Sequence, residues 1–158
     1  MSDFHLLLEE EIPRLMRYAA ALTRDADEAG ELVEDTVREA LTDERHCRGT
    51  SDIRVRLLTL LHDLRGNPFR QPAGPLSSPH RDPKALLTLS QLDRALGQLP
   101  EEQRAIILLI GLEGMSYGDT AAILRISLGT MRSRLSRGRT ALRQAMGVGK
   151  AQRLARAA

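Results

Sequence analysis

A proline-rich segment divides the chain and limits what it can fold into. Between residues 66 and 83 there are five prolines and two glycines. Proline lacks an amide proton and clashes with the preceding helical turn, so no continuous helix can cross this segment. The segment also offers little apolar material for a core, which predicts a flexible tether at residues 67–85. We therefore expect helical domains at 1–66 and 86–147, and a basic tail at 148–158.

Three amphipathic helices are predicted in the first block, where apolar residues recur at three- and four-residue steps. The inward-facing residues are Leu8, Ile12, Leu15, Ala19 and Leu22 in the first helix, Ala29, Leu32, Val33, Val37, Ala40 and Leu41 in the second, and Ile53, Leu57, Leu60, Leu61 and Leu64 in the third. Proline is tolerated in a first turn, so Pro13 predicts that the first regular helix starts near Ile12. The turn at residues 49–52 supplies capping residues for the third helix. Three helices with short connections predict a compact bundle.

The second block predicts a helix-turn-helix. The sequence indicates a helix over about residues 86–96, another beginning at Pro100 and ending near Gly111, a short helix from Tyr117 to Arg125 capped by Ser116, a turn at 126–128 and a last helix opening at Gly129. Carboxylates follow Pro100, where they face the positive end of the helix dipole. A short helix, a tight turn and a long basic helix are typical of a DNA-binding motif. The fold class is therefore all-α, with two small helical domains.

The net charge of +2 hides a strong polarity along the chain. Residues 1–46 contain 13 acidic and 5 basic residues, whereas residues 125–158 contain nine basic residues, eight of them arginine, and no acidic one. We expect a polyanion to be attracted to the C-terminal end and repelled by much of the N-terminal end.

Composition excludes several other classes. Aromatic residues make up 3% of the chain and there is no tryptophan, so the core is aliphatic, which favours helices. No apolar run approaches the roughly 20 residues of a membrane span, and the first residues lack the basic start of a signal peptide. The single cysteine, Cys47, has no partner for an internal disulfide. These features predict a cytoplasmic protein with no membrane partner.

The last helix separates an apolar face from a DNA-reading face on a helical wheel. Its core face holds Met131, Leu135, Gly138, Leu142, Ala145 and Met146. Short hydroxyl side chains allow close approach to DNA, and arginine can bridge guanine O6 and N7. We expect base contacts from Arg132, Ser133, Ser136 and Arg137. Arginines on the flanks of a groove-reading helix reach phosphates, and the candidates for this role are Arg134, Arg139 and Arg143.

Three segments of the second block, residues 96–104, 114–121 and 128–139, closely resemble region four of the extracytoplasmic-function (ECF) sigma factors. The specific part is the pattern Gly-Thr-x-x-Ser-Arg-x-x-Arg-x-Arg, which begins at Gly129. The resemblance implies a domain that reads the −35 promoter element and docks on RNA polymerase.

The first block resembles region two of the same family more loosely, and its residues 49–51 and 56–63 resemble the general-stress (EcfG-like) branch. This implies a polymerase-binding helix, with candidate residues Glu31, Leu32, Glu34 and Asp35. It also implies recognition of the −10 element, with candidates Thr50, Ser51, Arg56, His62 and Asp63. Arg56, His62 and Asp63 depart from the residues usual in the family, and an added carboxylate weakens binding to phosphates.

The resemblance implies a sigma factor that binds core RNA polymerase and promoter DNA for transcription initiation in a stress response. A small anti-sigma factor would hold the two domains together and hide their polymerase-binding faces. No small-molecule substrate is implied.

Two other functions stay open. A sigma-like mimic would bind an anti-sigma factor in place of polymerase, although it would have no need of a groove-reading helix. A plain helix-turn-helix regulator would usually dimerise, and no further helix for dimerisation follows Met146.

An enzyme finds little support in the sequence. The four histidines lack metal-ligand spacing, Cys47 has no CxxC partner, and there is no glycine-rich nucleotide-binding motif. We therefore expect no catalytic, metal or cofactor site.

Overall fold

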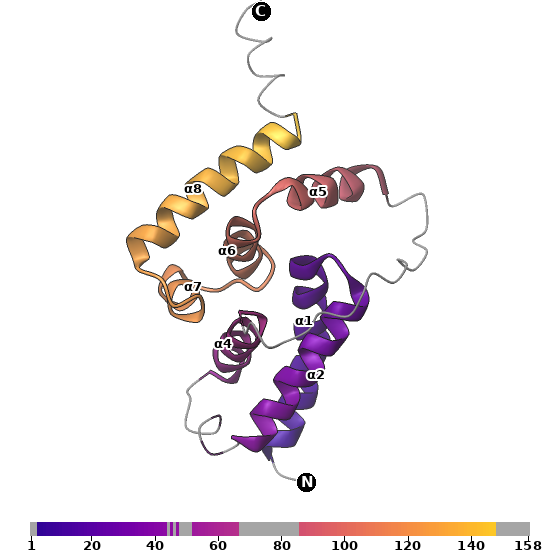
Figure 1. Ribbon diagram of the computed structural model, residues 1–158, viewed down its shortest axis with the longest axis vertical. Helices are drawn as coiled ribbons and strands as arrows, with labels where there is room; N and C mark the ends of the chain where they lie inside the picture. Colours follow the sequence, from indigo (N-terminus) through magenta and orange to yellow (C-terminus); the bar gives the residue numbers. More distant parts are fainter. Residues whose placement is uncertain (1–2, 44, 46, 48–51, 67–85, 148–158) are drawn as a thin grey trace, which may run out of the picture.

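The computed structural model describes residues 3–43, 45, 47, 52–66 and 86–147, and this part of the chain consists of helices and turns without a strand (Figure 1). The helices are α1 (Asp3–Thr23), α2 (Ala26–Thr42), α4 (Ile53–Arg65), α5 (Leu86–Gln98), α6 (Glu101–Gly111), α7 (Tyr117–Ile123) and α8 (Leu128–Ala145). The all-α prediction is confirmed. The predicted tether at 67–85, the tail at 148–158 and the candidates Thr50 and Ser51 lie outside the described residues.

The first three helices, α1, α2 and α4, form a bundle whose turns are set by aspartates. Asp25 caps α2 by accepting hydrogen bonds from the amides of Asp27 and Glu28 at 3.0 and 2.9 Å. Asp52 caps α4 through the amide of Arg54 at 2.9 Å. These side chains satisfy amides that have no partner in the first turn of a helix. The turns between helices are therefore encoded locally.

The prediction that the first helix starts near Ile12 was wrong, because α1 runs unbroken from Asp3 with Pro13 inside it. Pro13 lies on the exposed side of α1, where the helical carbonyl that loses its hydrogen bond can be solvated. Phe4 and Leu8 are both buried and hold the first two turns against the bundle. Tertiary packing therefore overrides the local cost of the proline.

The inward-facing residues of the bundle are mostly as predicted. Leu22, Leu32, Leu57 and Leu61 are fully buried. Leu41 was expected to face inward but is 41% exposed. It occupies the last turn of α2.

The second block folds as four helices, with α6 and α8 packed against each other. This contact is close because residue 138 of α8 is glycine. A Cβ atom at Gly138 would lie 3.0 Å from Cδ1 of Ile107 in α6, nearer than side chains normally approach. After α6, Gly114 adopts a left-handed backbone with φ +66°, a conformation that glycine accepts without strain. Both glycines thus have structural roles in placing α8.

The main hydrophobic core extends across both blocks. Leu58 and Leu61 of α4 belong to one buried cluster with residues of the C-terminal half. These are Leu109 of α6, Met115 in the turn after α6, and Ile123 of α7. A smaller cluster of Ile106, Ala121, Met131 and Leu135 holds α8 to α6 and α7. The two halves therefore pack directly on each other. None of the helices in the described part of the chain is long and apolar enough to cross a membrane.

Candidate nucleic-acid interface

Two serine caps define the helix-turn-helix. Ser116 accepts a hydrogen bond from the Asp119 amide at 3.0 Å and starts α7. Ser127 accepts one from the Thr130 amide at 3.1 Å and starts α8. The predicted cap at Ser116 is confirmed, whereas α8 starts at Leu128, one residue earlier than the predicted Gly129. A serine cap is small and uncharged, so it adds no negative charge at the start of the helix.

The turn between α7 and α8 depends on an arginine in an unusual backbone conformation. Arg125 has φ +53°, in the left-handed region that few residues other than glycine adopt. The predicted short helix was to end at Arg125, but α7 ends at Ile123 and the chain turns at Leu124 and Arg125. The turn also points the Arg125 side chain toward α4, where its Nε and Nη2 donate to both carboxylate oxygens of Asp63 at 2.8 Å.

The predicted division of α8 into two faces is observed. Met131, Leu135 and Gly138 are buried, and Leu142 is partly buried. Ala145, which was expected on the core face, is exposed in the last turn of α8. The outer face presents exposed side chains of Arg132, Ser133, Ser136, Arg137, Arg139 and Arg143. A hydroxyl- and guanidinium-bearing face of this kind is complementary to the edges and backbone of a DNA groove.

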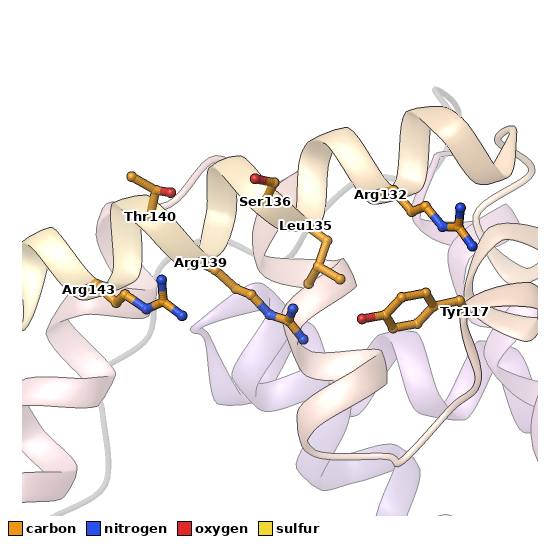
Figure 2. A pocket seen from close by; sticks show the side chains of 7 residues that line it. All are labelled: Tyr117, Arg132, Leu135, Ser136, Arg139, Thr140 and Arg143. Carbon is orange, nitrogen blue, oxygen red and sulfur yellow. The ribbon is translucent and has the colours of Figure 1, made fainter.

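One edge of this face borders a shallow cavity of about 320 Å³. Figure 2 shows Tyr117 beneath α8, with the guanidinium groups of Arg132 and Arg139 on the same side of the helix. The cavity walls carry three arginines and the hydroxyls of Tyr117, Ser136 and Thr140, and no carboxylate. Such a surface suits an anion such as a phosphate. Tyr117 was not singled out from the sequence, because a tyrosine after a helix cap gives no signal until its neighbours are known.

Arg134 differs from the other arginines of α8. Its Nη2 lies 3.3 Å from Oε2 of Glu102, on α6, and its side chain is 31% exposed. In this arrangement the Arg134 charge is compensated within the protein.

The candidate polymerase-binding residues on α2 have unequal positions. Glu31 is exposed. Glu34 and Asp35 both accept hydrogen bonds from Arg38 at 2.8 Å. Leu32 is fully buried in the bundle core, so it supports the helix and presents no surface to a partner.

The described −10 candidates lie on α4, and each has a partner. Arg56 pairs with Asp43 at 3.4 Å, and Asp63 with Arg125. The hydrogen bond from Arg125 holds the pKa of Asp63 below its usual value.

His62 lies deeper than the other −10 candidates. Its Nε2 shares a hydrogen bond of 2.7 Å with the hydroxyl of Tyr18, a fully buried residue of α1. Burial lowers the pKa of His62 from 6.5 to about 4, against the opposing influence of Glu101 and Asp63. Burial likewise raises the pKa of Tyr18. The imidazole is therefore neutral near pH 7, and its Nε2 can accept the hydrogen bond that the Tyr18 hydroxyl donates.

Within the described part of the chain, no group of three or more histidine, cysteine, aspartate or glutamate side chains is arranged to hold a metal ion.

Two family matches divide the chain as the helices do. Residues 89–142 match the family described as Sigma-70, region 4. Residues 8–62 match the family described as the Sigma2 domain of PhyR.

Sequence relatives and solved structures match most of the chain. The ECF RNA polymerase sigma factor EcfG of Rhodopseudomonas palustris is 31% identical over 143 residues, which cover 83% of this chain and 78% of the relative. The structure of the sigma factor RpoE in complex with the anti-sigma factor NepR, from Bartonella quintana, superposes with a TM-score of 0.76 at 29% identity, over 94% of this chain and 99% of RpoE.

A second solved structure agrees in fold alone. The anti-anti-sigma factor PhyR in complex with NepR, also from Bartonella quintana, gives a TM-score of 0.60 at 17% identity, over 85% of this chain and 47% of that one.

Proposed function

The chain belongs to the ECF RNA polymerase sigma factors and is of the EcfG-like branch, and on this premise we propose a role for each half of the molecule. As a sigma factor it binds core RNA polymerase and directs promoter recognition, and members of this family are not enzymes. In our proposal α8 reads the −35 element, and the bundle of α1, α2 and α4 binds polymerase and recognises the −10 element. We assign these roles to domains at 1–66 and 86–147, acting in the cytoplasm and without catalysis.

The observation that carries this assignment is the outer face of α8. Arg132 and Arg137 are exposed there beside Ser133 and Ser136, and no described carboxylate pairs with either arginine. An ordinary solvated helix mixes acidic and basic residues, because opposite charges four residues apart stabilise it. A helix with exposed arginines and no acid is instead suited to a polyanion. The serines leave room for the backbone to approach the groove.

Within the C-terminal domain, contacts to bases and to phosphates are assigned to different residues. We propose that Arg132, Ser133, Ser136 and Arg137 face base edges and that Arg139 and Arg143, with Arg134, reach phosphates. Arg139 and Arg143 line the cavity beside Tyr117, where an oxyanion is favoured; Arg132 and Ser136 also border this cavity, at the edge that it shares with the proposed base-reading face. Arg134 must exchange Glu102 for a phosphate on binding, so its contribution is smaller than that of the two others.

In the N-terminal domain, the acidic surface of α2 suits a protein partner better than DNA. Glu31, Glu34 and Asp35 give that surface a negative charge that repels phosphates. We propose this surface as the polymerase contact. For recognition of the −10 element we propose Arg56, His62 and Asp63 of α4, together with Thr50 and Ser51, which precede it in the sequence.

We also propose a small anti-sigma factor as a partner. RpoE, which is 29% identical to this chain and covers nearly all of it, is described in complex with the anti-sigma factor NepR. The likeness extends through both halves, so a partner that contacts both has equivalent surfaces available here.

The test is in vitro transcription with purified core polymerase on a general-stress-type promoter. The wild-type chain is expected to give specific transcripts. The double variant Arg132→Ala/Arg137→Ala is expected to reduce them by at least about tenfold, since each bidentate base contact contributes roughly 1–3 kcal/mol. Arg94→Ala, an exposed arginine on α5, is the matched control and should leave transcription unchanged. Equal transcription by the double variant and the control would contradict the proposal.

One observation favours a second candidate function. Residues 8–62 match the Sigma2 domain of PhyR, and the PhyR of the structural comparison is described as an anti-anti-sigma factor. A chain that binds an anti-sigma factor but supports no specific transcript with core polymerase would be a sigma mimic. Transcripts that depend on Arg132 and Arg137 would exclude this function.

A further inference from the structure

The two halves of the molecule meet along a seam where α4 and α1 face α6 and α7 (Figure 1). The seam has an apolar part, in which Leu61 of α4 shares a core with Leu109 and Ile123. It also has a cavity of about 340 Å³, lined by His62, Arg65 and residues of α6 and α8. The end of α4 is therefore the element of the N-terminal half most closely engaged with the helix-turn-helix.

Two bidentate ion pairs fasten the end of α4 to the other half. Asp63 receives two hydrogen bonds of 2.8 Å from Arg125, in the turn of the helix-turn-helix. Arg65 donates to both carboxylate oxygens of Glu101, at the start of α6, at 2.8 and 2.9 Å. Arg65 also contacts Glu28 of α2, which fixes its position within the bundle. Bidentate pairs specify orientation as well as attraction, and these two have opposite polarity.

Two further ion pairs cross the seam from α1 and the residue that follows it. Arg24 donates to both oxygens of Asp93 in α5 at 3.2 Å. Arg17 lies 3.5 Å from Glu113, whose carboxylate is almost completely buried. In three of the four pairs the cation comes from the acidic N-terminal half and the anion from the basic C-terminal half. The ion pairs at the seam therefore depend on individual residues, and their polarity does not follow from the net charge of each half.

This arrangement affects the two DNA-reading surfaces differently. On α4, Asp63 is engaged by Arg125, and His62 lies at the wall of the seam cavity with its ring bonded to Tyr18. On α8, Arg132 and Arg137 are exposed, and neither lines the seam cavity. The closed molecule thus presents its −35 face while two of its −10 candidates are occupied.

We propose that the Asp63–Arg125 and Arg65–Glu101 pairs form an electrostatic latch that keeps the free protein closed and withholds the end of α4 until the halves separate. The consequence for promoter access rests on the proposed function, whereas the latch itself does not. When the halves separate, the four charged groups of the two ion pairs become solvated. Separation is therefore favoured by salt, which screens the pairs, and by a partner that binds one of the separated halves.

The test is a charge exchange in the full chain, followed by small-angle X-ray scattering without polymerase or DNA. Asp63→Arg and Arg125→Asp each place like charges together, and the double variant restores an opposite pair. Aspartate tolerates the left-handed backbone at position 125, and arginine suits the last turn of α4, so neither change strains its helix. Arg94→Glu, a charge reversal at an exposed residue of α5 that does not line the seam cavity, is the control.

We expect a larger radius of gyration for each single variant than for the wild type and Arg94→Glu at the same salt, and recovery in the double variant. We also expect the wild type to expand as salt rises toward 1 M. Single variants as compact as the wild type, or a double variant as expanded as the single ones, would overturn the latch. Circular dichroism confirms that each variant keeps its helices.

A second measurement follows His62 by NMR titration in the wild type. The wild-type pKa of about 4 is expected to rise as the chain expands at high salt, because opening the seam admits water to the imidazole; the wild type is used because Asp63 itself raises this pKa and its replacement would change the pKa directly. An unchanged pKa in the expanded wild type would overturn the claim that the seam shields this residue. Neither measurement requires promoter activity, so failure of the proposed function and failure of the latch are distinguishable.

Discussion

The two halves of the molecule use their charged side chains in opposite ways. On α2, Arg38 pairs with Glu34 and Asp35 at 2.8 Å, which offsets part of the acidic charge of the helix and leaves it negative overall. On α8, Arg132 and Arg137 are exposed without an acid partner among the described residues. Exposed pairs within one helix contribute little to stability, whereas uncompensated cations can neutralise phosphates and so release the counterions condensed on a nucleic acid. The comparison separates a surface suited to protein from one suited to nucleic acid.

Although the two halves differ in charge, they share a hydrophobic core. Leu109 of α6 is buried in the same cluster as Leu61 of α4, whereas Met131 of α8 belongs to the smaller cluster of the C-terminal half. The N-terminal bundle therefore depends on the C-terminal half for part of its cover.

The largest expected effect comes from the shared core. Leu109→Ala should lower the free energy of unfolding by about 2–5 kcal/mol, the usual cost of a cavity in a core. It should also speed amide exchange in α1, because its side chain contributes to the cover of the N-terminal bundle. Met131→Ala, the matched control, should destabilise α8 and leave α1 protected. Unchanged exchange in α1 of the Leu109 variant would show that the halves are energetically independent.

The next effect concerns pH and the N-terminal half. The pKa of His62 is about 4 in the folded protein and 6.5 when unfolded, so the unfolded chain binds a proton more readily. Stability is therefore full above pH 6.5 and declines as pH falls toward 4, by about 2–3 kcal/mol at most for a partly exposed group. Tyr18, Glu101, Asp63 and Arg65 surround the ring and modulate the change.

Urea unfolding at pH 7.5 and 4.5 measures this decline. His62→Gln should flatten the dependence between these values, whereas His5→Gln, an exposed histidine on α1, should leave it as in the wild type. Asp63 and Glu101 have lowered pKa values because Arg125 and Arg65 donate to them, so their contributions are lost only below about pH 4.5. A His62 variant with the wild-type slope would assign the decline to other groups.

The third effect is on base selection by α8. Arg137→Ala should cost about 1–3 kcal/mol, or roughly 5- to 150-fold, at one −35 position and little at the others. Competition binding on a set of promoters with single −35 substitutions measures this selectivity. Uniform weakening on all of them would make Arg137 a phosphate contact.

The fourth effect separates phosphate contacts from base contacts on α8. Arg143→Ala should weaken binding equally on all sequences and reduce the slope of log affinity against log salt by about 0.9. Arg134→Ala should give a smaller change, because its guanidinium already pairs with Glu102. Salt titrations of both variants on one promoter give the comparison. Equal losses would mean that the Glu102 pair has no bearing on DNA binding.

The smallest expected effect is on the surface of α2. Glu34→Gln removes one side of an exposed pair with Arg38, and the free energy of unfolding should change by about 0.5 kcal/mol or less. Binding to core polymerase should weaken by more than this if α2 is the contact surface. Glu39→Gln, which alters another exposed carboxylate of α2, provides a comparison for the loss of one charge. Equal polymerase binding by both variants and the wild type would move the contact elsewhere.

Much of the C-terminal half could be predicted because its signals are local. Ser116 caps α7 as expected, and the alternation of apolar and basic residues placed Met131 and Leu135 inward and Arg137 outward. A cap acts over three residues and a helical face repeats every three or four, so both can be read from neighbouring residues. The same reasoning identified Ser133 and Ser136 as part of an accessible face.

Signals that depend on distant residues were misread or missed. Pro13 was expected to start the helix, but Phe4 and Leu8 hold the preceding turns in place through tertiary contacts. Tyr117 gave no indication of its position beside Arg132 and Arg139, because that depends on the angle between α7 and α8. His62 and Asp63 were interpreted only as DNA contacts, since their partners lie 44 and 62 residues away along the chain.

The sequence by itself determined the existence of the helices, the exposed basic face of α8, and the distribution of charge between the ends of the chain. These follow from local periodicity, capping and composition. Only the tertiary structure decided that the halves share a core, that Gly138 lets α8 approach Ile107, and that Asp63 pairs with Arg125. The physical reason is that packing and ion pairing join residues through space, and the spacing of residues along a helix carries no record of a partner on another helix.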